Sequence, residues 1–182
     1  MIIHRLDAAA ARELRPQLAT LLLDAVADGF SLGFLAGLDD TQLAAYWEGV
    51  EHELARGSRV LLGAEQDGML VGTVQLALPR EPGGANRAAL EKILVHCTAR
   101  RRGVGTALLQ AAEIEALSLR RGLLFLDAEA GSGAERLVER AGFVRVGELP
   151  DFACTPNGHW RPAAIWYKTL FPRARRAVRP AP

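Results

Sequence analysis

Residues 91–110, EKILVHCTARRRGVGTALLQ, decide the fold of this chain. An apolar run ends at Val95, arginines and glycines follow over residues 100–105, and apolar residues then recur every three or four positions. This pattern predicts a strand over residues 88–96 and a helix over residues 103–121. Glycines let a backbone approach a phosphate closely, and a helix N-terminus offers free N–H groups and a positive dipole end. We therefore expect a phosphorylated ligand at the turn between strand and helix.

Two other phosphate-binding motifs are excluded by the same residues. A P-loop requires G-x-x-x-x-G-K-[ST], and no such string occurs. A dinucleotide-binding fingerprint requires a third glycine where Leu108 stands, and here a predicted antiparallel hairpin precedes the strand. The remaining alternative is an exposed basic turn that starts a helix and binds nothing.

The other predicted elements lie on both sides of this segment. Strands are predicted over residues 2–6, 59–65, 69–78, 123–127, 143–148 and 163–169, and helices over residues 8–28, 41–56 and 133–141. Asp67-Gly68 predicts a hairpin turn, and Gly122 is expected to cap the long helix. Because that helix joins strands 88–96 and 123–127, the two strands should run parallel.

Length and composition describe one ordinary globular domain. Of the 182 residues, 49% are hydrophobic and 24% are charged. The net charge is +1, but four arginines lie in the last ten positions and leave −3 for the rest. That balance gives no electrostatic reason to expect nucleic-acid or membrane binding. We expect a single domain over residues 1–170 and a disordered Arg/Pro-rich tail over residues 171–182.

The cysteines predict neither disulfides nor a metal site. Cys97 and Cys154 do not make a disulfide framework, and no Cys/His cluster along the sequence has the spacing of a zinc site. His96 and Cys97 are therefore expected to be packing and loop residues. No apolar run reaches 18 residues, and the N-terminus lacks a signal peptide's apolar stretch. These features predict a cytoplasmic protein, and aromatic residues outside the expected core leave a homodimer open.

The segment 91–110 resembles the acetyl-CoA-binding motif of the GNAT superfamily of N-acetyltransferases. That motif is an apolar strand, a residue like Val95, and then [RQ]-x-x-G-x-[GA]. AGFVRVGEL at residues 141–149 is similar to the family's G-F turn, and the order of elements over residues 2–169 is similar to the GNAT fold. The resemblance implies an α/β fold whose mixed, mostly antiparallel sheet has six to seven strands, about four flanking helices and one splayed parallel pair.

A narrower resemblance is to tabtoxin-resistance-type acetyltransferases. It is carried by the strings SLGFLAGLD, NRAALEKILV, RGLLFLDAEAGSGAE and VGELPDFACTPNG and by the closing AIWYKTL. It implies an acetyl-CoA-dependent N-acetyltransferase acting on a small amine, such as an amino-acid-like toxin or antibiotic. Two alternatives stay open: an acetyltransferase for protein N-termini or lysines, and a non-catalytic acyl-CoA-binding regulatory protein.

The resemblance also implies which residues hold acetyl-CoA. The pyrophosphate would bind the backbone N–H groups of residues 101–106, and the pantetheine arm would bind the backbone of Val95. The expected cofactor-binding residues are Val95, Arg100, Arg101, Arg102, Gly103, Val104, Gly105, Thr106 and Ser132.

The reaction requires a base, because an amine with a pKa of about 10 is mostly protonated at neutral pH. Asp127 is the first candidate, since it lies at the carboxyl end of its strand, where ligands of such sheets bind. An alternative role for Asp127 is to order the adjoining loop. Glu129 has the same strand parity, and Glu91 is the second candidate, nearer the start of its strand.

The leaving thiolate can be protonated by an acid, and at the position of that acid this sequence differs from the family. The usual pattern is A-x-x-[LF]-Y-x-x-x-G-F, and Val138 stands in place of the tyrosine. Water, Ser132 or Tyr167 could supply the proton, or the thiolate leaves unassisted. Val138 is also the best support for the non-catalytic alternative.

Aromatic residues and two loops are the candidates for acceptor binding. We expect residues 29–38 and the long connection 150–162 to select the substrate. The candidate substrate-binding residues are Phe30, Phe34, Trp47, Glu129 and Phe152, with a core role as the alternative for the aromatics.

Overall fold

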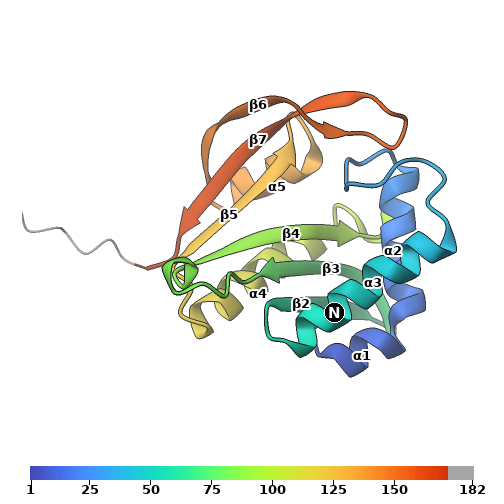
Figure 1. Cartoon of the computed structure of the whole chain (residues 1–182), viewed down its shortest axis with the longest axis horizontal. Coiled ribbons are helices and arrows are strands. Elements are labelled where there is room, and N and C mark those ends of the chain that lie inside the picture. Colours follow the sequence, from blue (N-terminus) through green and yellow to red (C-terminus); the bar gives the residue numbers. More distant parts are fainter. Residues whose placement is uncertain (172–182) are drawn as a thin grey trace, which may run out of the picture.

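The computed structural model describes residues 1–171 and contains one seven-stranded sheet with the strand order β1-β2-β3-β4-β5-β7-β6 (Figure 1). Of the predicted tail, only Phe171 is described, and residues 172–182 lie outside the described part of the chain. The elements are β1 (Ile2–Leu6), α1 (Ala8–Glu13), α2 (Arg15–Ala27), α3 (Asp40–Ala55), β2 (Arg59–Gln66), β3 (Met69–Ala77), η1 (Pro82–Gly84), β4 (Arg87–Val95), η2 (Cys97–Ala99), α4 (Val104–Ser118), β5 (Leu123–Glu129), α5 (Gly133–Arg140), β6 (Val144–Cys154) and β7 (Trp160–Thr169).

The β4–β5 pair is parallel, as predicted, and it is paired over only part of its length. Its register runs from Arg87 opposite Leu123 to Ala89 opposite Phe125, and no pairing continues toward Val95. The other neighbouring strands are antiparallel. The sheet therefore opens between the carboxyl ends of β4 and β5, which is the splayed pair that the family resemblance implied.

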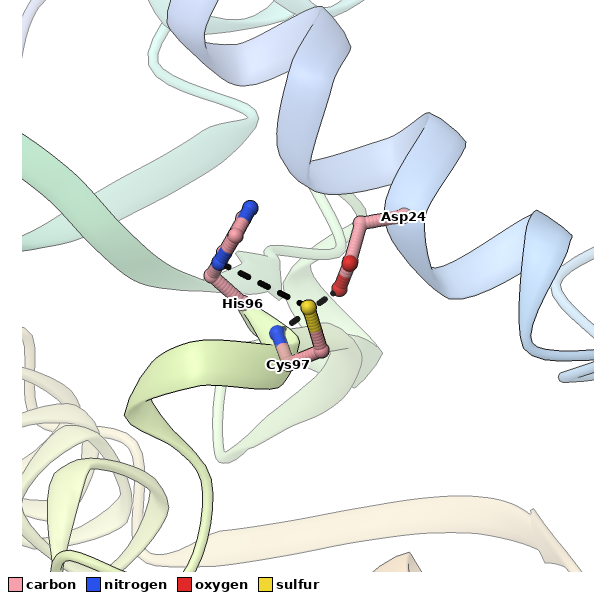
Figure 2. A group of neighbouring side chains, drawn as sticks. All are labelled: Asp24, His96 and Cys97. Carbon is pink, nitrogen blue, oxygen red and sulfur yellow. Dashed lines mark hydrogen bonds between the residues drawn. The ribbon is translucent and has the colours of Figure 1, made fainter.

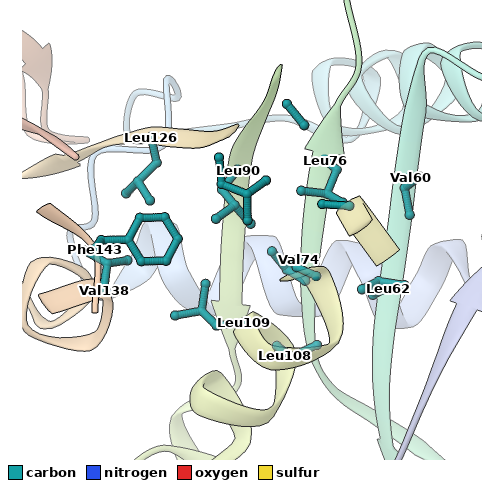
Figure 3. Close-up of a cluster of buried hydrophobic side chains, with 14 of the residues drawn as sticks. Val60, Leu62, Val74, Leu76, Leu90, Leu108, Leu109, Leu126, Val138 and Phe143 are labelled. Atoms are coloured by element: carbon teal, nitrogen blue, oxygen red, sulfur yellow. The ribbon is translucent and has the colours of Figure 1, made fainter. Parts of the chain in front are cut away.

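The two faces of the sheet carry separate hydrophobic cores. On one face α4 and α5 pack over the strands, and Leu108, Leu109 and Val138 belong to that core (Figure 3). On the other face α1, α2 and α3 pack over β1–β4, with Leu18 and Trp47 among the buried residues. Burial of apolar surface on both faces stabilises the sheet and fixes its position between the helices.

Local signals explain most element boundaries. The Asp39 side chain accepts a hydrogen bond from the backbone N–H of Gln42, and the Gln42 side chain accepts one from the backbone N–H of Asp39. This capping box starts α3. Asp67 and Gly68 both have positive φ (52° and 77°), as a type I′ hairpin turn requires. The helix predicted over residues 8–28 is divided at Leu14, because a proline in the first turn of α2 favours a new helix start.

Gly122 does not cap α4, contrary to the prediction. The residue with a left-handed backbone after the helix is Arg120 (φ 56°). Gly122 is instead a point of close packing, because a Cβ there would lie 2.3 Å from Cδ2 of Phe171 and 2.7 Å from Oδ1 of Asn86.

The connection predicted as a long loop over residues 150–162 is largely a hairpin. β6 continues to Cys154 and β7 begins at Trp160. The register shifts between Leu149 and Ala153, where Asp151 has φ 50°, so the turn-forming residues produce a bulge. β6 is an edge strand that tolerates such an interruption. Apolar side chains of β6 are exposed, and a homodimer stays a prediction.

Candidate active site

The N-terminus of α4 presents backbone N–H groups at the opening between β4 and β5. Gly103 is the N-cap residue with φ 86°, a conformation that favours glycine, and Arg101 before it has φ 61°. No side chain of residues 1–171 caps this helix. The first-turn N–H groups of Val104, Gly105 and Thr106 therefore lie at the positive end of the helix dipole without a side-chain acceptor, which suits a phosphate.

Gly105 controls how closely α4 approaches its neighbours. A Cβ at this residue would lie 3.0 Å from Cδ2 of Leu137 on α5 and 3.8 Å from Cγ2 of Val95. The start of the helix is thus packed against both α5 and the end of β4.

The backbone of Val95 faces the same opening. The N–H of His96 donates to the carbonyl oxygen of Val71 on β3 (3.0 Å). Successive backbone groups of a strand point to opposite edges, so the N–H and C=O of Val95 point toward β5. β5 does not pair there, and the N–H of Val95 is directed into the splayed gap.

Arg100 holds this turn in place. Its Nε donates to the carbonyl oxygen of Val95 (2.8 Å), its Nη2 pairs with Asp24 (2.6 Å), and its Nη1 pairs with Asp28. The guanidinium also lies over the ring of Phe30, 5.3 Å from its centroid. The side chain of Arg100 is consequently engaged by protein groups, and Arg101 and Arg102 are the exposed arginines of the turn.

A second group of side chains gathers on the face of the sheet opposite α4. Phe125 lies opposite Tyr167, and Asp127 lies opposite Ile165, in the antiparallel β5–β7 pair. Residues opposite each other share a face, as do residues two apart along a strand. Because Leu126 belongs to the core beneath α4 and α5, Asp127 and Tyr167 lie on the other face.

The three candidate bases have different surroundings. Glu91 Oε2 accepts a hydrogen bond from Arg59 Nη1 (2.7 Å), and Glu129 Oε2 accepts one from the Ser31 hydroxyl (2.9 Å). Asp127 is exposed and has no hydrogen bond or ion pair from residues 1–171 to its carboxylate. Of these three carboxylates, Asp127 is the one that no side chain of residues 1–171 binds.

Glu91 belongs to a polar network beneath α3. Arg59 binds Gln75 Oε1 (2.6 Å) and Glu53 as well as Glu91, and Gln75 donates to the hydroxyl of Tyr46 (3.0 Å). Burial raises the pKa of Tyr46 to about 12. Glu91 therefore has a structural ion-pair partner in Arg59, and Arg59 lines an open cleft of about 340 Å³.

Lys92 occupies the irregularity of β4 and was not predicted as a site residue. Its φ is 48°, where the β3–β4 register shifts, and its Nζ donates to the carbonyl oxygen of Leu32 (2.7 Å). Burial lowers the pKa of Lys92, and the charges of Glu91 and Asp127 oppose that change. The special position of Lys92 comes from the β-bulge, and a lysine within an apolar strand pattern does not by itself predict a bulge.

Comparison with known proteins identifies the family. Residues 22–143 match the acetyltransferase (GNAT) family, which is more than half of the chain. The chain belongs to the GNAT family. It is an acyltransferase that uses acetyl-CoA, and the unpaired N–H groups at α4 and Val95 fit the pyrophosphate and the pantetheine arm of that molecule.

Solved structures of other acetyltransferases share the fold. Ribosomal-protein-alanine N-acetyltransferase from Brucella melitensis is 23% identical, with a TM-score of 0.76 and coverage of 93% of this chain and 99% of that one. YncA from Salmonella typhimurium, with its cofactor acetyl-CoA, is 20% identical, with a TM-score of 0.73 and 96% coverage of both chains. Aminoglycoside 6'-N-acetyltransferase from Enterococcus faecium is 20% identical, with a TM-score of 0.70 and coverage of 95% and 99%. Within residues 1–171, no helix is both long and apolar enough to span a membrane.

The position of the usual GNAT tyrosine lies in the core of this chain. Val138 is fully buried near Leu126 and Phe143 (Figure 3). Ser132 caps α5, since its hydroxyl accepts from the backbone N–H of Glu135 (3.2 Å). Tyr167 is half-buried on the face of the sheet opposite α4, which it shares with Asp127.

The predicted aromatic residues are dispersed in this GNAT fold. Trp47 is 1% exposed in the core beneath α3, so its side chain is not available to a substrate. Phe34 packs edge-on against Tyr46, with 5.2 Å between ring centroids. Phe30 lies against Arg100, and Phe152 is 49% exposed on the edge strand β6. Phe30 and Phe34 thus lie within the loop between α2 and α3.

Proposed function

We propose that this GNAT acetyltransferase transfers the acetyl group of acetyl-CoA to the amine of a small molecule, with Asp127 as the base. The observation that carries the proposal is the unpaired carboxylate of Asp127, beside the splayed end of β4 and β5. An ammonium acceptor can donate a proton to this carboxylate before it attacks the thioester. The N–H of Val95, directed into the same gap, is suited to hold the carbonyl oxygen of the acetyl group.

The loop between α2 and α3 favours a small acceptor over a protein chain. Ser31 is bound to Glu129 (2.9 Å), the carbonyl of Leu32 to Lys92 (2.7 Å), and the N–H of Ala36 to the carbonyl of Pro156 (2.8 Å). These three bonds tie the loop to β5, to β4 and to the β6–β7 turn. A loop held on three sides limits the groove that an extended peptide needs, which argues against the protein acetyltransferase alternative.

The substrate class that we propose is an amino-acid-like toxin or an antibiotic, in a cytoplasmic resistance enzyme. The resemblance to tabtoxin-resistance-type acetyltransferases supports the first, and the aminoglycoside acetyltransferase among the structural neighbours supports the second. The exposed carboxylate of Asp127 suits a cationic amine in either class.

Protonation of the leaving thiolate is assigned to water or to Tyr167. Val138 has no proton to donate, and Ser132 is engaged as the cap of α5. Tyr167 shares the open face with Asp127 and carries the hydroxyl nearest in register to it.

The test is acetyl-CoA turnover against a panel of acceptors: free amino acids, aminoglycosides, and peptides with a free N-terminus or a lysine. CoA should be quantified by chromatography, because an exposed thiol such as that of Cys97 would add to the signal of a thiol reagent. We expect kcat/KM for one small-molecule class to exceed that for every peptide by at least tenfold. A preference for peptides would establish the protein acetyltransferase, and acetyl-CoA binding without turnover on any amine would establish the non-catalytic protein.

A further inference from the structure

Asp24, His96 and Cys97 form a compact group of donor atoms that the acetyl-transfer site does not use (Figure 2). Their ligand atoms, one oxygen, one nitrogen and one sulfur, all lie within 4.8 Å of one another. Asp24 comes from α2, 73 positions before Cys97, whereas His96 and Cys97 follow β4. The sequence spacing therefore shows no metal motif, although the fold brings the three side chains together.

We propose that Asp24, His96 and Cys97 bind a Zn²⁺ ion, and that this ion weakens acetyl-CoA binding by competing with Arg100 for Asp24. Thiolate and imidazole ligands select Zn²⁺ over Mg²⁺ or Ca²⁺, and a carboxylate is a common third ligand. Three protein ligands leave the fourth tetrahedral position to water.

The geometry of the group fits this metal. The His96 Nδ1 and the Cys97 Sγ are 3.8 Å apart. Two such ligands on a tetrahedral Zn²⁺ would be about 3.5 Å apart, given bond lengths of about 2.0 Å and 2.3 Å. His96 Nδ1 lies 3.4 Å from the backbone nitrogen of Thr98, whose N–H it accepts from, and 2.9 Å from the Thr98 hydroxyl oxygen, so a metal ion would replace these contacts at the Nδ1 lone pair. Small side-chain rotations complete the site.

The carboxylate is positioned in advance and the thiol is accessible. The backbone N–H of Cys97 donates to Asp24 Oδ2 (2.9 Å), so α2 and the end of β4 are already connected at this point. The Cys97 side chain is exposed, which gives an ion a path from solvent. As Zn²⁺ binds, the sulfur–metal bond replaces the S–H bond and the proton passes to water.

Arg100 couples the group to the acetyl-CoA site. Arg100 Nη2 donates to Asp24 Oδ2 (2.6 Å), and the same guanidinium holds the carbonyl of Val95 through Nε (2.8 Å). A cation bound to Asp24 repels the Arg100 guanidinium and occupies the carboxylate that accepts the hydrogen bond from Arg100. The turn that binds acetyl-CoA then loses one of the contacts that orders it, and by linkage acetyl-CoA weakens Zn²⁺ binding by the same factor.

The first experiment titrates Co²⁺, as a spectroscopic substitute for Zn²⁺, into tag-free protein with a non-thiol reductant. We expect one equivalent to produce the near-ultraviolet thiolate-to-cobalt charge-transfer band and the strong visible bands of tetrahedral coordination, reversed by Zn²⁺. Cys154 provides the matched control because it is the only other cysteine. Cys154→Ser should keep the band and Cys97→Ser should lose it. No band in the wild type, or a band that persists in Cys97→Ser, would overturn the proposal.

The second experiment measures acetyl-CoA affinity by calorimetry with and without saturating Zn²⁺. Acetyl-CoA is the correct probe, because the free thiol of CoA would itself bind the metal. We expect Zn²⁺ to weaken acetyl-CoA binding at least fivefold in the wild type and in Cys154→Ser, and to have no effect in Cys97→Ser. A cobalt site with unchanged acetyl-CoA affinity would overturn the coupling through Arg100. Far-ultraviolet circular dichroism of each variant shows that it is folded.

Discussion

The guanidinium of Arg100 donates to the carbonyl oxygen of Val95 (2.8 Å) and is itself held by Asp24 and Asp28. One side chain thus joins α2, the end of β4 and the turn that precedes α4. A lysine retains the charge but has a single nitrogen, which cannot reproduce this planar set of contacts.

Arg100→Lys is therefore expected to weaken acetyl-CoA binding about tenfold and to lower the Tm. Calorimetric titration with acetyl-CoA at two salt concentrations measures the effect. Arg102→Gln is the matched control, since Arg102 is exposed, and its effect should decline at high salt as screening increases. A loss in Arg100→Lys that salt abolishes would show that Arg100 acts as a simple charge.

Gly103 has φ 86° with no atom within 4 Å of a Cβ placed on it, so strain alone opposes a side chain. Gly103→Ala should cost about 1–2 kcal/mol of folding free energy. Gly103→Asn should cost less, because asparagine tolerates the left-handed region. Urea unfolding compares the two variants, and equal losses would contradict the role given to the backbone conformation.

Asp127→Asn should lower kcat by about 10²–10⁴-fold and leave acetyl-CoA affinity unchanged, because an amide cannot accept the proton. Glu91→Gln is the contrasting variant, since Glu91 is paired with Arg59 (2.7 Å). We expect Glu91→Gln to reduce kcat less than tenfold while lowering the Tm. Steady-state kinetics with the best acceptor distinguish the two residues, and a larger effect at Glu91 would move the base to β4.

Lys92→Met should raise KM for the acceptor with little change in acetyl-CoA affinity. The substitution removes the bond from Nζ to the carbonyl of Leu32 (2.7 Å) and releases one tie of the α2–α3 loop. Kinetics at saturating acetyl-CoA, with calorimetry for the cofactor, separate the two effects. An unchanged KM would show that this tie does not shape the acceptor site.

Glu135 makes the stability of α5 dependent on pH. Its carboxylate accepts from the backbone N–H of Gly131 (2.6 Å) and from Arg145 Nε (3.0 Å), and these bonds, the first above all, lower its pKa. A pKa lower in the folded state stabilises the fold above the unfolded-state pKa of about 4.3, and this stability is lost as the pH falls through the folded value.

Glu135→Gln should therefore lower the Tm at pH 7 by roughly 2–4 °C, corresponding to about 1 kcal/mol. The difference from the wild type should disappear near the acid end of the transition, where Glu135 is protonated in both states. Thermal unfolding across a pH series measures it. A difference that stays constant with pH would mean that the carboxylate charge is not involved.

Features that depend on neighbouring residues were predictable from the sequence alone. The D-G step at Asp67 predicted the hairpin, and the arginine–glycine turn predicted the start of α4 and, through its resemblance, the family. Turn and cap geometries follow from the φ preferences of a few adjacent residues, so a short string is sufficient. The prediction of a long connection over residues 150–162 was wrong, because turn-forming residues there make a bulge within a hairpin.

Features that depend on distant residues were decided by the tertiary structure alone. The sequence ranks Asp127 before Glu91 by strand position, but it does not show that Arg59, 32 positions from Glu91, binds one carboxylate while no partner within residues 1–171 binds the other. The contact of Asp24 with Cys97 and the burial of Trp47 in the core likewise depend on residues that are distant in the sequence. The free energy of a polar or buried side chain depends on what packs against it, and in a folded chain those neighbours are supplied by other elements.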